Sequence, residues 1–341
     1  MATNIDATAR PAAAVQPPVP SSLGLTTDST VPRRFAHRRS TEGVFVTGVA
    51  RDGERLVAVG HLPRLHRLYN DTAGRHHDIL LIAEVLRQGV EVIAHALLEV
   101  PLDSQFVLRS VDVRVVSTQA TIVGEDTAEI VIAVPVDRVR RNRRGAVYAI
   151  DGPVRAWIDG RPAATMTGSV AFLAHDGYAE LRADSAGRVL NVRPGLLAMA
   201  APGAVVGRYF PGNVLITTPS GPPRDASAEV LPLRHPAFFD RRLDHYPGML
   251  IAEASRQLAV AAMVVHADVD AGSLRTDAAA MDFVSFAELD VALSCRVAGW
   301  DTDTDGGGQA VTIWAEQNGQ VVTRSRFVLS PADTRGPELA S

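Results

Sequence analysis

The sequence predicts an α+β fold made of two copies of one domain, each with a long helix wrapped by a curved antiparallel sheet. Residues 81–88 recur as residues 250–257, an offset of 169 residues, and both segments read Leu-Ile-Ala-Glu-x-x-Arg-Gln. At the same offset, the motif His-x-x-aromatic-x-Asp begins at His66 and again at His235. No gap is needed across this window, so we interpret the chain as an internal duplication.

The same order of elements is predicted in both copies. A strand comes first (43–49 and 213–217), then the loop with the His motif, then an apolar stretch of helical length (79–98 and 248–266). The later segments alternate apolar and polar residues, as half-buried strands do; they are 106–116, 128–134, 146–158 and 163–173, then 283–297, 309–317 and 320–329. One helix followed by a meander of antiparallel strands indicates a sheet curled around a single buried helix.

These elements set the domain boundaries that we expect. Residues 1–30, rich in Ala, Pro, Thr and Ser, are expected to be disordered. The first domain is expected over 31–175, a linker rich in Gly, Ala and Pro over 176–212, the second domain over 213–331, and a flexible tail over 332–341. The N-terminal segment lacks the basic start and apolar run of a signal peptide, so we expect a cytoplasmic protein.

Charged residues interrupt both long apolar segments. The first carries Glu84, Arg87 and Glu91, and the second carries Glu253 and Arg256. Placing such side chains in the core of a bilayer costs several kcal/mol each. We therefore expect buried helices of a soluble protein, with no membrane partner.

Composition excludes several classes of function. Lysine is absent, so all 34 basic residues are arginine, which rules out Schiff-base chemistry and the P-loop and kinase lysines. The net charge of −4 argues against nucleic acid as a partner. The single cysteine, Cys295, lies in an apolar stretch and is predicted to be a small buried residue.

The repeated Glu-x-x-Arg sequence is the strongest candidate for a functional site. Residues i and i+3 share a helix face, so Glu84 and Arg87 project together, as do Glu253 and Arg256. An exposed pair of this kind is usually a weak surface salt bridge. Here the flanking residues are apolar on all sides, so the charges are expected to be buried with the helix. Because burying charge is costly, function explains the repeat better than stability does.

Histidines accompany both motifs. His66 and His235 lie 18 residues before their glutamates, and histidine with a carboxylate can transfer protons near neutral pH. His76 and His245 lie eight residues before the glutamates and are expected to shape the start of each helix and to bind substrate. No metal-ligand spacing occurs, so we predict neither a metal nor a cofactor.

The second copy resembles the β-hydroxyacyl-acyl carrier protein dehydratase pattern of the hot-dog fold, in the sequence His235-Pro…Pro247-Gly248…Glu253-x-x-x-Gln257 with four extra residues between His and Glu. More closely, residues 31–330 resemble the A-factor synthase (AfsA) family, which carries two hot-dog repeats. The matching stretches are Val31-Pro…His37-Arg38, Val44-Phe45-Val46-Thr47, Gly74-Arg75-x-His77-Asp78…Glu84-x-x-Arg87-Gln88 and Asp244-His245-x-x-Gly248-Met249…Glu253-Ala254-x-Arg256-Gln257. The first copy departs in one place, with Asp78-Ile79 where the second has Pro-Gly.

The resemblance implies an acyltransferase that joins a β-ketoacyl group, from acyl carrier protein or acyl-CoA, to dihydroxyacetone phosphate for a γ-butyrolactone-type signal. It also implies functional Glu/Arg pairs at Glu84 with Arg87 and at Glu253 with Arg256. In dehydratases of this fold the histidine and the acid come from different hot-dog domains. The two copies are therefore expected to pack as an internal pseudo-dimer with crossed sites, His66 near Glu253 and His235 near Glu84.

The chemistry of that reaction fits the residues available. No covalent nucleophile is evident, so we expect Glu253 or His235 to act as a base and helix N-terminal amides to stabilise the oxyanion. Arg256 or Arg87 is expected to hold the phosphate. Two other functions stay open: a dehydratase or thioesterase acting on acyl-ACP or acyl-CoA, suggested by the His/Glu pair alone, and a non-catalytic regulator that binds an acyl ligand.

Residues 138–144 contain five arginines, the one dense basic run in the chain. The run is either a solvated face of a hairpin or a docking surface for an acidic acyl carrier protein. It lacks the interleaved aromatic residues that favour nucleic-acid binding. Whether two chains form a homodimer is left open.

Overall fold

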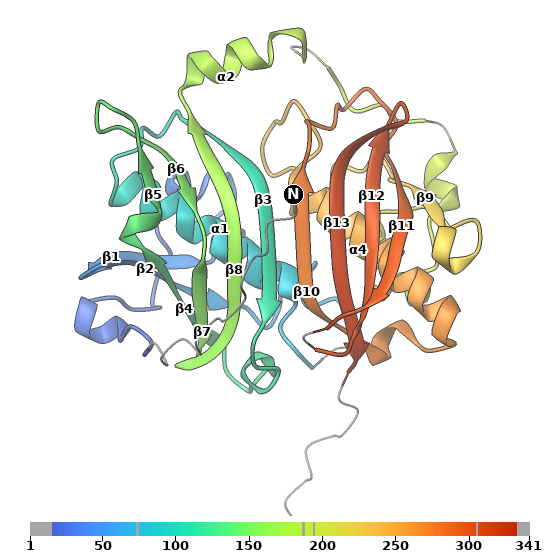
Figure 1. Ribbon diagram of the computed structural model, residues 1–341, viewed down its shortest axis with the longest axis horizontal. Helices are drawn as coiled ribbons and strands as arrows, with labels where there is room; N and C mark the ends of the chain where they lie inside the picture. Colours follow the sequence, from blue (N-terminus) through green and yellow to red (C-terminus); the bar gives the residue numbers. More distant parts are fainter. Residues whose placement is uncertain (1–15, 73–74, 186–187, 194, 305, 333–341) are drawn as a thin grey trace, which may run out of the picture.

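The computed structural model describes residues 16–72, 75–185, 188–193, 195–304 and 306–332. Within these residues 13 strands form one antiparallel sheet, and the two long helices lie side by side behind it (Figure 1). The strand order along the sheet is β1-β2-β4-β7-β8-β3-β10-β13-β12-β11-β9, and β5 and β6 extend it at β8.

Each copy contributes one half of the sheet and one long helix. The first copy holds β1 (Val46–Asp52), β2 (Arg55–Leu62), α1 (Ile79–Ala96), β3 (Gln105–Val115), β4 (Ala128–Pro135), β5 (Val139–Arg141), β6 (Val147–Asp151), β7 (Val154–Ile158) and β8 (Arg161–Leu173). The second holds β9 (Ser227–Glu229), α4 (Gly248–Ala267), β10 (Leu274–Phe283), β11 (Ser294–Thr302), β12 (Gln309–Gln317) and β13 (Gln320–Pro331). The short helices α2 (His175–Leu181) and α3 (Gly203–Val206) lie between them.

The two halves are joined through β3 and β10, which are the edge strands of their own halves. These strands pair antiparallel, with Val111 opposite Met281 and Arg114 opposite Ala278, so the sheet continues from one copy into the other (Figure 1). Both long helices are buried almost completely, and their apolar faces share one core with the strands. The predicted arrangement, two helices each wrapped by a sheet and packed as an internal pseudo-dimer, is confirmed.

The helices begin and end close to their predicted bounds, for different local reasons. Asp78 caps α1, and its side chain accepts a hydrogen bond from the Leu80 backbone N–H at 2.8 Å. Helix α4 instead follows Pro247 and has no side-chain cap, and it ends at Asp268, which adopts the left-handed conformation with φ of 52°. By length and hydropathy α4 passes as a membrane span, yet 78% of its apolar window is buried inside the fold.

Three strand predictions are wrong. The predicted strand 213–217 forms only isolated bridges, between Ile216 and Val230 and between Thr217 and Ala200. The predicted strand 283–297 is the end of β10, then a loop, then the start of β11. This loop alternates buried and exposed residues as a strand does, but its Glu288 N–H bonds to the side chain of Gln317 at 2.7 Å instead of joining a ladder. Strands β2 and β10 were not predicted at all. The predicted strand 146–158 is two strands, β6 and β7, separated at Gly152-Pro153.

The segments expected to lie outside the domains are partly built into them. Residues 16–30 were expected to be disordered but are ordered, because Leu23 and Leu25 pack against Val57 and Val59 of β2. Residues 1–15 and 333–341, where the rest of the disordered segment and the tail were expected, lie outside the described residues. The expected linker contains α2, α3 and the fully buried side chain of Arg208.

Candidate active site

The Glu84 cluster lies on the buried face of α1. Glu84 is 1% exposed and accepts hydrogen bonds from Arg87 Nε and Nη2, both at 2.8 Å, from Gln88 Nε2 at 2.8 Å, and from Arg38. Burial opposes ionisation of Glu84, but the two arginines outweigh burial and hold the pKa of its carboxyl well below the usual range. Arg87 also bonds to Glu91, one turn further along the helix. Both charges predicted to be buried are therefore paired, as buried charges must be.

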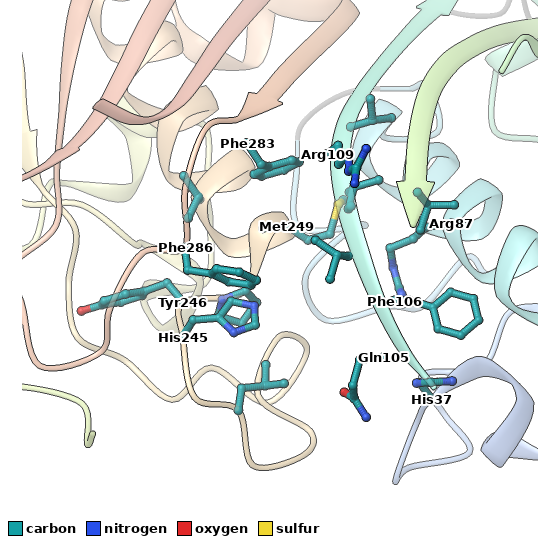
Figure 2. A pocket seen from close by; sticks show the side chains of 18 of the residues that line it. His37, Arg87, Gln105, Phe106, Arg109, His245, Tyr246, Met249, Phe283 and Phe286 are labelled. Atoms are coloured by element: carbon teal, nitrogen blue, oxygen red, sulfur yellow. The ribbon is translucent and has the colours of Figure 1, made fainter. Parts of the chain in front are cut away.

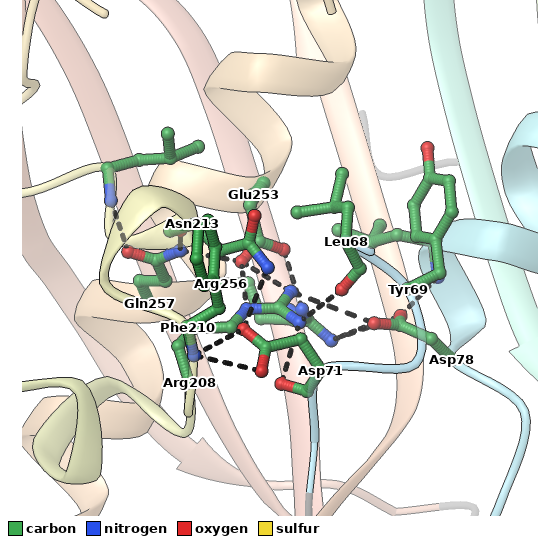
Figure 3. Close-up of polar contacts among 12 residues, drawn as sticks. Leu68, Tyr69, Asp71, Asp78, Arg208, Phe210, Asn213, Glu253, Arg256 and Gln257 are labelled. Carbon is green, nitrogen blue, oxygen red and sulfur yellow. Dashed lines mark hydrogen bonds and ion pairs between the residues drawn. The ribbon is translucent and has the colours of Figure 1, made fainter. Parts of the chain in front are cut away.

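The Glu253 cluster repeats this arrangement on α4 (Figure 3). Glu253 accepts from Arg208 Nη2 at 2.6 Å, from Arg256 Nη2 at 2.6 Å and from Gln257 Nε2 at 2.7 Å. Arg208 and Arg256 lower the pKa of the Glu253 carboxyl against the effect of burial. Arg256 Nη1 also donates to both oxygens of Asp78, at 3.0 Å each, and Asp78 belongs to the other copy. Both oxygens of Glu253 and both terminal nitrogens of Arg256 are therefore held by neighbours.

Sequence reasoning assigned no role to the second arginine in each cluster, Arg38 or Arg208. These residues are equivalent in the two copies but lie 170 residues apart, whereas the glutamates lie 169 apart. A comparison without gaps does not align them, because the first copy has one more residue than the second between this arginine and the His motif. The available signal was that both arginines precede their copy's first extended segment by the same interval.

The loop that carries the His-x-x-aromatic-x-Asp motif crosses to the other copy. Arg38 donates to the backbone carbonyl of Ala237 at 3.2 Å, and Arg208 donates to that of Leu68 at 2.8 Å. Asp71 accepts from the backbone N–H of Phe210 at 3.0 Å, and Asp240 accepts from that of Arg39 at 2.9 Å. The motif's aspartates therefore fasten the two copies together.

One large cavity, about 1140 Å³, opens beside the Glu84 cluster. Residues of both copies line it: His37, Phe106 and Arg87 on one side, and His245, Tyr246 and Phe286 on the other (Figure 2). Its apolar lining includes Leu108, Ile150, Val154, Met166, Val170, Met249, Phe283 and Val284. The volume slightly exceeds the roughly 300–1,000 Å³ range of ligand pockets. The side chain of Arg87 is 23% exposed, whereas that of Arg256 is 10% exposed.

The space beside the Glu253 cluster is much smaller, about 70 Å³, and is lined by His76, Asp78 and Arg256 among others. Asp78 closes it, because the same carboxylate caps α1 and binds Arg256. The equivalent position in the second copy is Pro247, which offers no carboxylate to Arg87. The departure Asp78-Ile79 for Pro-Gly is thus the difference between a closed and an open site.

The predicted crossing of His66 and His235 is wrong. His66 lies near Glu84 of its own copy, and His235 lies near Glu253 of its own copy. Both Nδ1 atoms accept backbone N–H groups of their own loops, and His235 Nε2 bonds to Asn213 at 2.8 Å. Neither ring lines the large cavity. Burial lowers the pKa of His235 to about 4. The residues that do cross are His245, which lines the cavity of the first copy's helix, and His76, which lines the small space beside Arg256.

His245 is held by a chain of polar contacts. Its Nδ1 lies 2.7 Å from Asp244 Oδ1, and Asp244 also accepts from Tyr178 Oη at 3.0 Å and from Arg182 Nε at 2.8 Å. Burial opposes ionisation of Asp244, but the bonds from His245 and Arg182 outweigh it and lower the pKa of that carboxyl. Because a carboxylate only accepts hydrogen bonds, Nδ1 of His245 carries the proton and Nε2 keeps a lone pair. The sequence pattern indicated His245 but not its partners.

Helix α4 presents its N-terminus to the same cavity, through Gly248 and Met249. A side chain at Gly248 would meet the ring of Phe283, with its Cβ 2.9 Å from two ring carbons, so this approach requires glycine. With no side-chain cap, the first backbone N–H groups of α4 are available to a ligand.

Other predicted residues lie away from the cavity or add to its wall. Cys295 is buried, and burial raises the pKa of its thiol to about 12. The arginine run forms the exposed β5–β6 hairpin, where Arg140 bonds to Asp151 at 2.8 Å. Across the residues with assigned coordinates, no group of three His, Cys, Asp or Glu side chains lies close enough together to hold a metal ion.

Comparison with known proteins was made for sequence and for structure. The family model for the A-factor biosynthesis hotdog domain, AfsA, matches residues 23–174 and 194–331. A 2-oxo-3-(phosphooxy)propyl 3-oxoalkanoate synthase of Streptomyces coelicolor is 32% identical over 231 residues, covering 67% of this chain and 71% of the relative. One of the same name from Streptomyces virginiae is 32% identical over 234 residues, covering 68% and 77%. An oleoyl thioesterase (putative) from Lactobacillus plantarum superposes with a TM-score of 0.47 at 11% identity, covering 81% and 96%. Both copies of the repeat fall within the matched segments, and the chain belongs to the A-factor biosynthesis hot-dog (AfsA) family.

Proposed function

We propose that this chain is an acyltransferase that joins a β-ketoacyl group from an acyl thioester to the hydroxyl of dihydroxyacetone phosphate, giving the precursor of a γ-butyrolactone-type signal. The observation that carries the proposal is the large cavity beside the Glu84 cluster, in which a long apolar wall meets a group of arginines and carboxylates. An acyl chain suits the apolar wall, and a phosphorylated acceptor suits the arginines. The names of the relatives from two Streptomyces species support the same reaction.

The reaction takes place at the open site, which uses the helix face of the first copy and the loop of the second. Arg87 serves here in binding the acceptor, since it is the member of the two repeated arginines that reaches the cavity. Glu84 holds Arg87 and Arg38 in place. Glu253, Arg256, His76 and Arg208 form the closed counterpart, whose role is to bind the copies together.

His245 is the base in this proposal, in place of Glu253 or His235. Its Nε2 takes the proton of the acceptor hydroxyl, and the hydroxyl oxygen forms a bond to the thioester carbonyl carbon. The backbone N–H groups at the start of α4 stabilise the negative charge on the carbonyl oxygen. The carbon–sulfur bond then breaks, and the thiol leaves with the proton from His245. His66 and His235 keep their loops in shape and do not enter the reaction.

The acyl donor is carried by acyl carrier protein in this proposal. The basic β5–β6 hairpin continues through Ile150 and Gly152 into the wall of the cavity, so an acidic carrier bound there would lie beside the opening. Both halves of the site come from one chain, so a second chain is not needed to complete it. The substrates and carrier belong to the cytoplasm, where we place the enzyme.

Mass spectrometry of the products tests the function. The protein is incubated with a β-ketoacyl thioester and dihydroxyacetone phosphate, and in a parallel reaction with a β-hydroxyacyl thioester. The proposal predicts a phosphorylated keto ester that depends on both substrates. Free acid without ester would indicate a thioesterase, and enoyl product from the second thioester would indicate a dehydratase. Thermal stabilisation by the thioester without any product would indicate a binding protein.

A further inference from the structure

Arg241 differs from Arg87 and Arg38, the two arginines of the Glu84 cluster, in the partners that it has. Arg87 is bonded to Glu84 and Glu91, and Arg38 is bonded to Glu84. Arg241 lines the same cavity, yet across the described part of the chain no carboxylate lies within ion-pair distance of it. Its one hydrogen bond goes to a ring nitrogen, His37 Nδ1, at 3.2 Å.

Arg241 contacts His37, which is paired with His95. The hydrogen-bond partners of the two rings decide which ring nitrogens carry protons. A guanidinium only donates, so His37 Nδ1 accepts and His37 carries its proton on Nε2. His95 Nδ1 lies 2.7 Å from the carbonyl oxygen of Val100, which only accepts, so His95 carries its proton on Nδ1. The Nε2 atoms of the two rings lie 2.7 Å apart, with His37 donating and His95 accepting. Both rings are therefore neutral, and the pair forms a fixed, uncharged support for Arg241.

Arg241 is buried beside both carboxylates and arginines. Burial lowers the pKa of Arg241 and is the main cause of its shift, while Glu91 and Asp240 raise this pKa and Arg87 and Arg38 lower it. Burial and Arg241 likewise lower the pKa of His37 to about 3, which agrees with a neutral ring. In addition, Arg38 Nε is buried and has no hydrogen-bond partner among the described residues. This corner of the cavity thus holds three guanidinium groups and spare N–H donors.

We propose that Arg241, positioned by the neutral His37–His95 pair, binds the phosphate group of the acceptor. The oxygens of a phosphate dianion accept hydrogen bonds from the N–H groups of the planar Arg241 fork that have no carboxylate partner. Arg87 contributes from one side but is already held by two glutamates. A carboxylate support would neutralise the charge of Arg241, and a protonated histidine would repel it, so a pair of neutral histidines is suited to keeping it free for a ligand.

Because this inference rests on the proposed acyl transfer, its test compares acceptors that differ only in the phosphate. Steady-state kinetics are measured for wild type, Arg241→Gln and Arg241→Lys with dihydroxyacetone phosphate and with dihydroxyacetone. We expect Arg241→Gln to raise KM for the phosphorylated acceptor about 10- to 100-fold, the value of a hydrogen bond to a charged group. KM for the acyl thioester and the rate with dihydroxyacetone should stay within about twofold. Arg241→Lys should recover part of the loss, since it keeps the charge but not the fork.

Two further variants separate positioning from folding. His37 has φ of 51°, and asparagine tolerates this conformation, so His37→Asn removes the ring with little backbone strain. It should raise KM for the phosphorylated acceptor by a smaller factor than Arg241→Gln does, with kcat and KM for the thioester retained. Arg51→Ala, on an exposed strand outside the cavity, is the matched control and should change none of these values.

The outcomes distinguish this inference from the proposed function. An equal KM for dihydroxyacetone phosphate in wild type and Arg241→Gln would overturn the phosphate role while leaving the acyl transfer intact. If the wild type makes no ester, calorimetric titration with dihydroxyacetone phosphate still tests the site. Binding that Arg241→Gln abolishes would support the inference without the transferase, and equal binding by both proteins would contradict it.

Discussion

Glu84 and Glu253 show how identical residues acquire different surroundings. Each accepts hydrogen bonds from two arginines and from the glutamine one turn later, so both carboxylates are ionised and neither is free to act as a base. The arginine of the repeated Glu-x-x-Arg sequence has a different additional partner in each copy: Glu91 of the same helix for Arg87, and Asp78 of the other copy for Arg256. Glu91 retains an unpartnered Oε2 within the described structure, and burial raises the pKa of its carboxyl.

Acid should unfold the protein through these carboxylates. The folded pKa of Glu84 lies below its unfolded value of 4.5, so its contribution to stability is complete above that pH and is lost as the pH falls below it. At pH 7, Glu84→Gln should lower the free energy of unfolding by about 3–5 kcal/mol, because it leaves buried arginines unpaired. Urea unfolding at pH 7 and at pH 3.5 should show a smaller pH dependence in Glu84→Gln than in wild type. Glu54→Gln, on an exposed turn, should keep the wild-type dependence, and an unchanged slope in Glu84→Gln would refute the assignment.

The role given to His245 predicts a loss of rate. Replacing it with glutamine should lower kcat about 10²- to 10⁴-fold, the usual contribution of a general base. KM for the acyl thioester should change little, since the apolar wall is intact. Asp244→Asn should lower kcat less, because the ring loses its carboxylate partner but keeps its place. His266→Gln, outside the cavity, serves as the control. A kcat within threefold of wild type for His245→Gln would exclude it as the base.

At the scale of elements, the N-termini of α1 and α4 decide which site is open. Asp78 caps α1 and reaches Arg256, whereas α4 follows Pro247 and leaves its first amides uncovered next to the cavity. Two positions of the duplicated sequence therefore separate a closed site from an open one. Helix α2 helps to hold His245 in place, because Arg182, at the end of this helix, binds Asp244 and Glu288.

Substitution of Asp78 tests its double role. Asp78→Asn keeps a capping oxygen but removes the charge that pairs with Arg256, and Asp78→Ala removes both. Loss of the cap alone costs about 1 kcal/mol, and a buried arginine left without its carboxylate costs more. Chemical denaturation should therefore rank stability as wild type, then Asp78→Asn, then Asp78→Ala. Equal stability of all three proteins would contradict both roles of Asp78, as the cap of α1 and as the partner of Arg256.

The sequence predicted the helices better than the strands, for a physical reason. The runs around Glu84 and Glu253 are apolar, long and repeated, and both helices begin at their predicted residues. Strand β10 was missed because its Ala-rich middle carries little strand propensity and is fixed by pairing with β3 and β13. The loop after Phe283 was taken for a strand because its buried residues alternate, although they line the cavity and the core and join no ladder.

At the scale of the whole molecule, the duplication places both halves of a pseudo-dimer in one chain. A homodimer has two equivalent sites, but a duplicated chain can change one of them independently, and here one is open and the other sealed. The resemblance to hot-dog dehydratases implied that the sites cross between copies, but the histidines assigned to the crossing were the wrong ones. His66 and His235 recur together with an aspartate because that loop fastens the copies, which is a structural reason for a repeated motif.

The most direct test of a single site shared by both copies is the stoichiometry of ligand binding. Isothermal titration calorimetry with a non-cleavable thioether analogue of the β-ketoacyl donor measures how many molecules each chain binds. The large cavity beside the Glu84 cluster predicts one molecule per chain. Two molecules per chain would contradict the closure of the second site by Asp78, and no binding would contradict the acyl-transfer proposal itself.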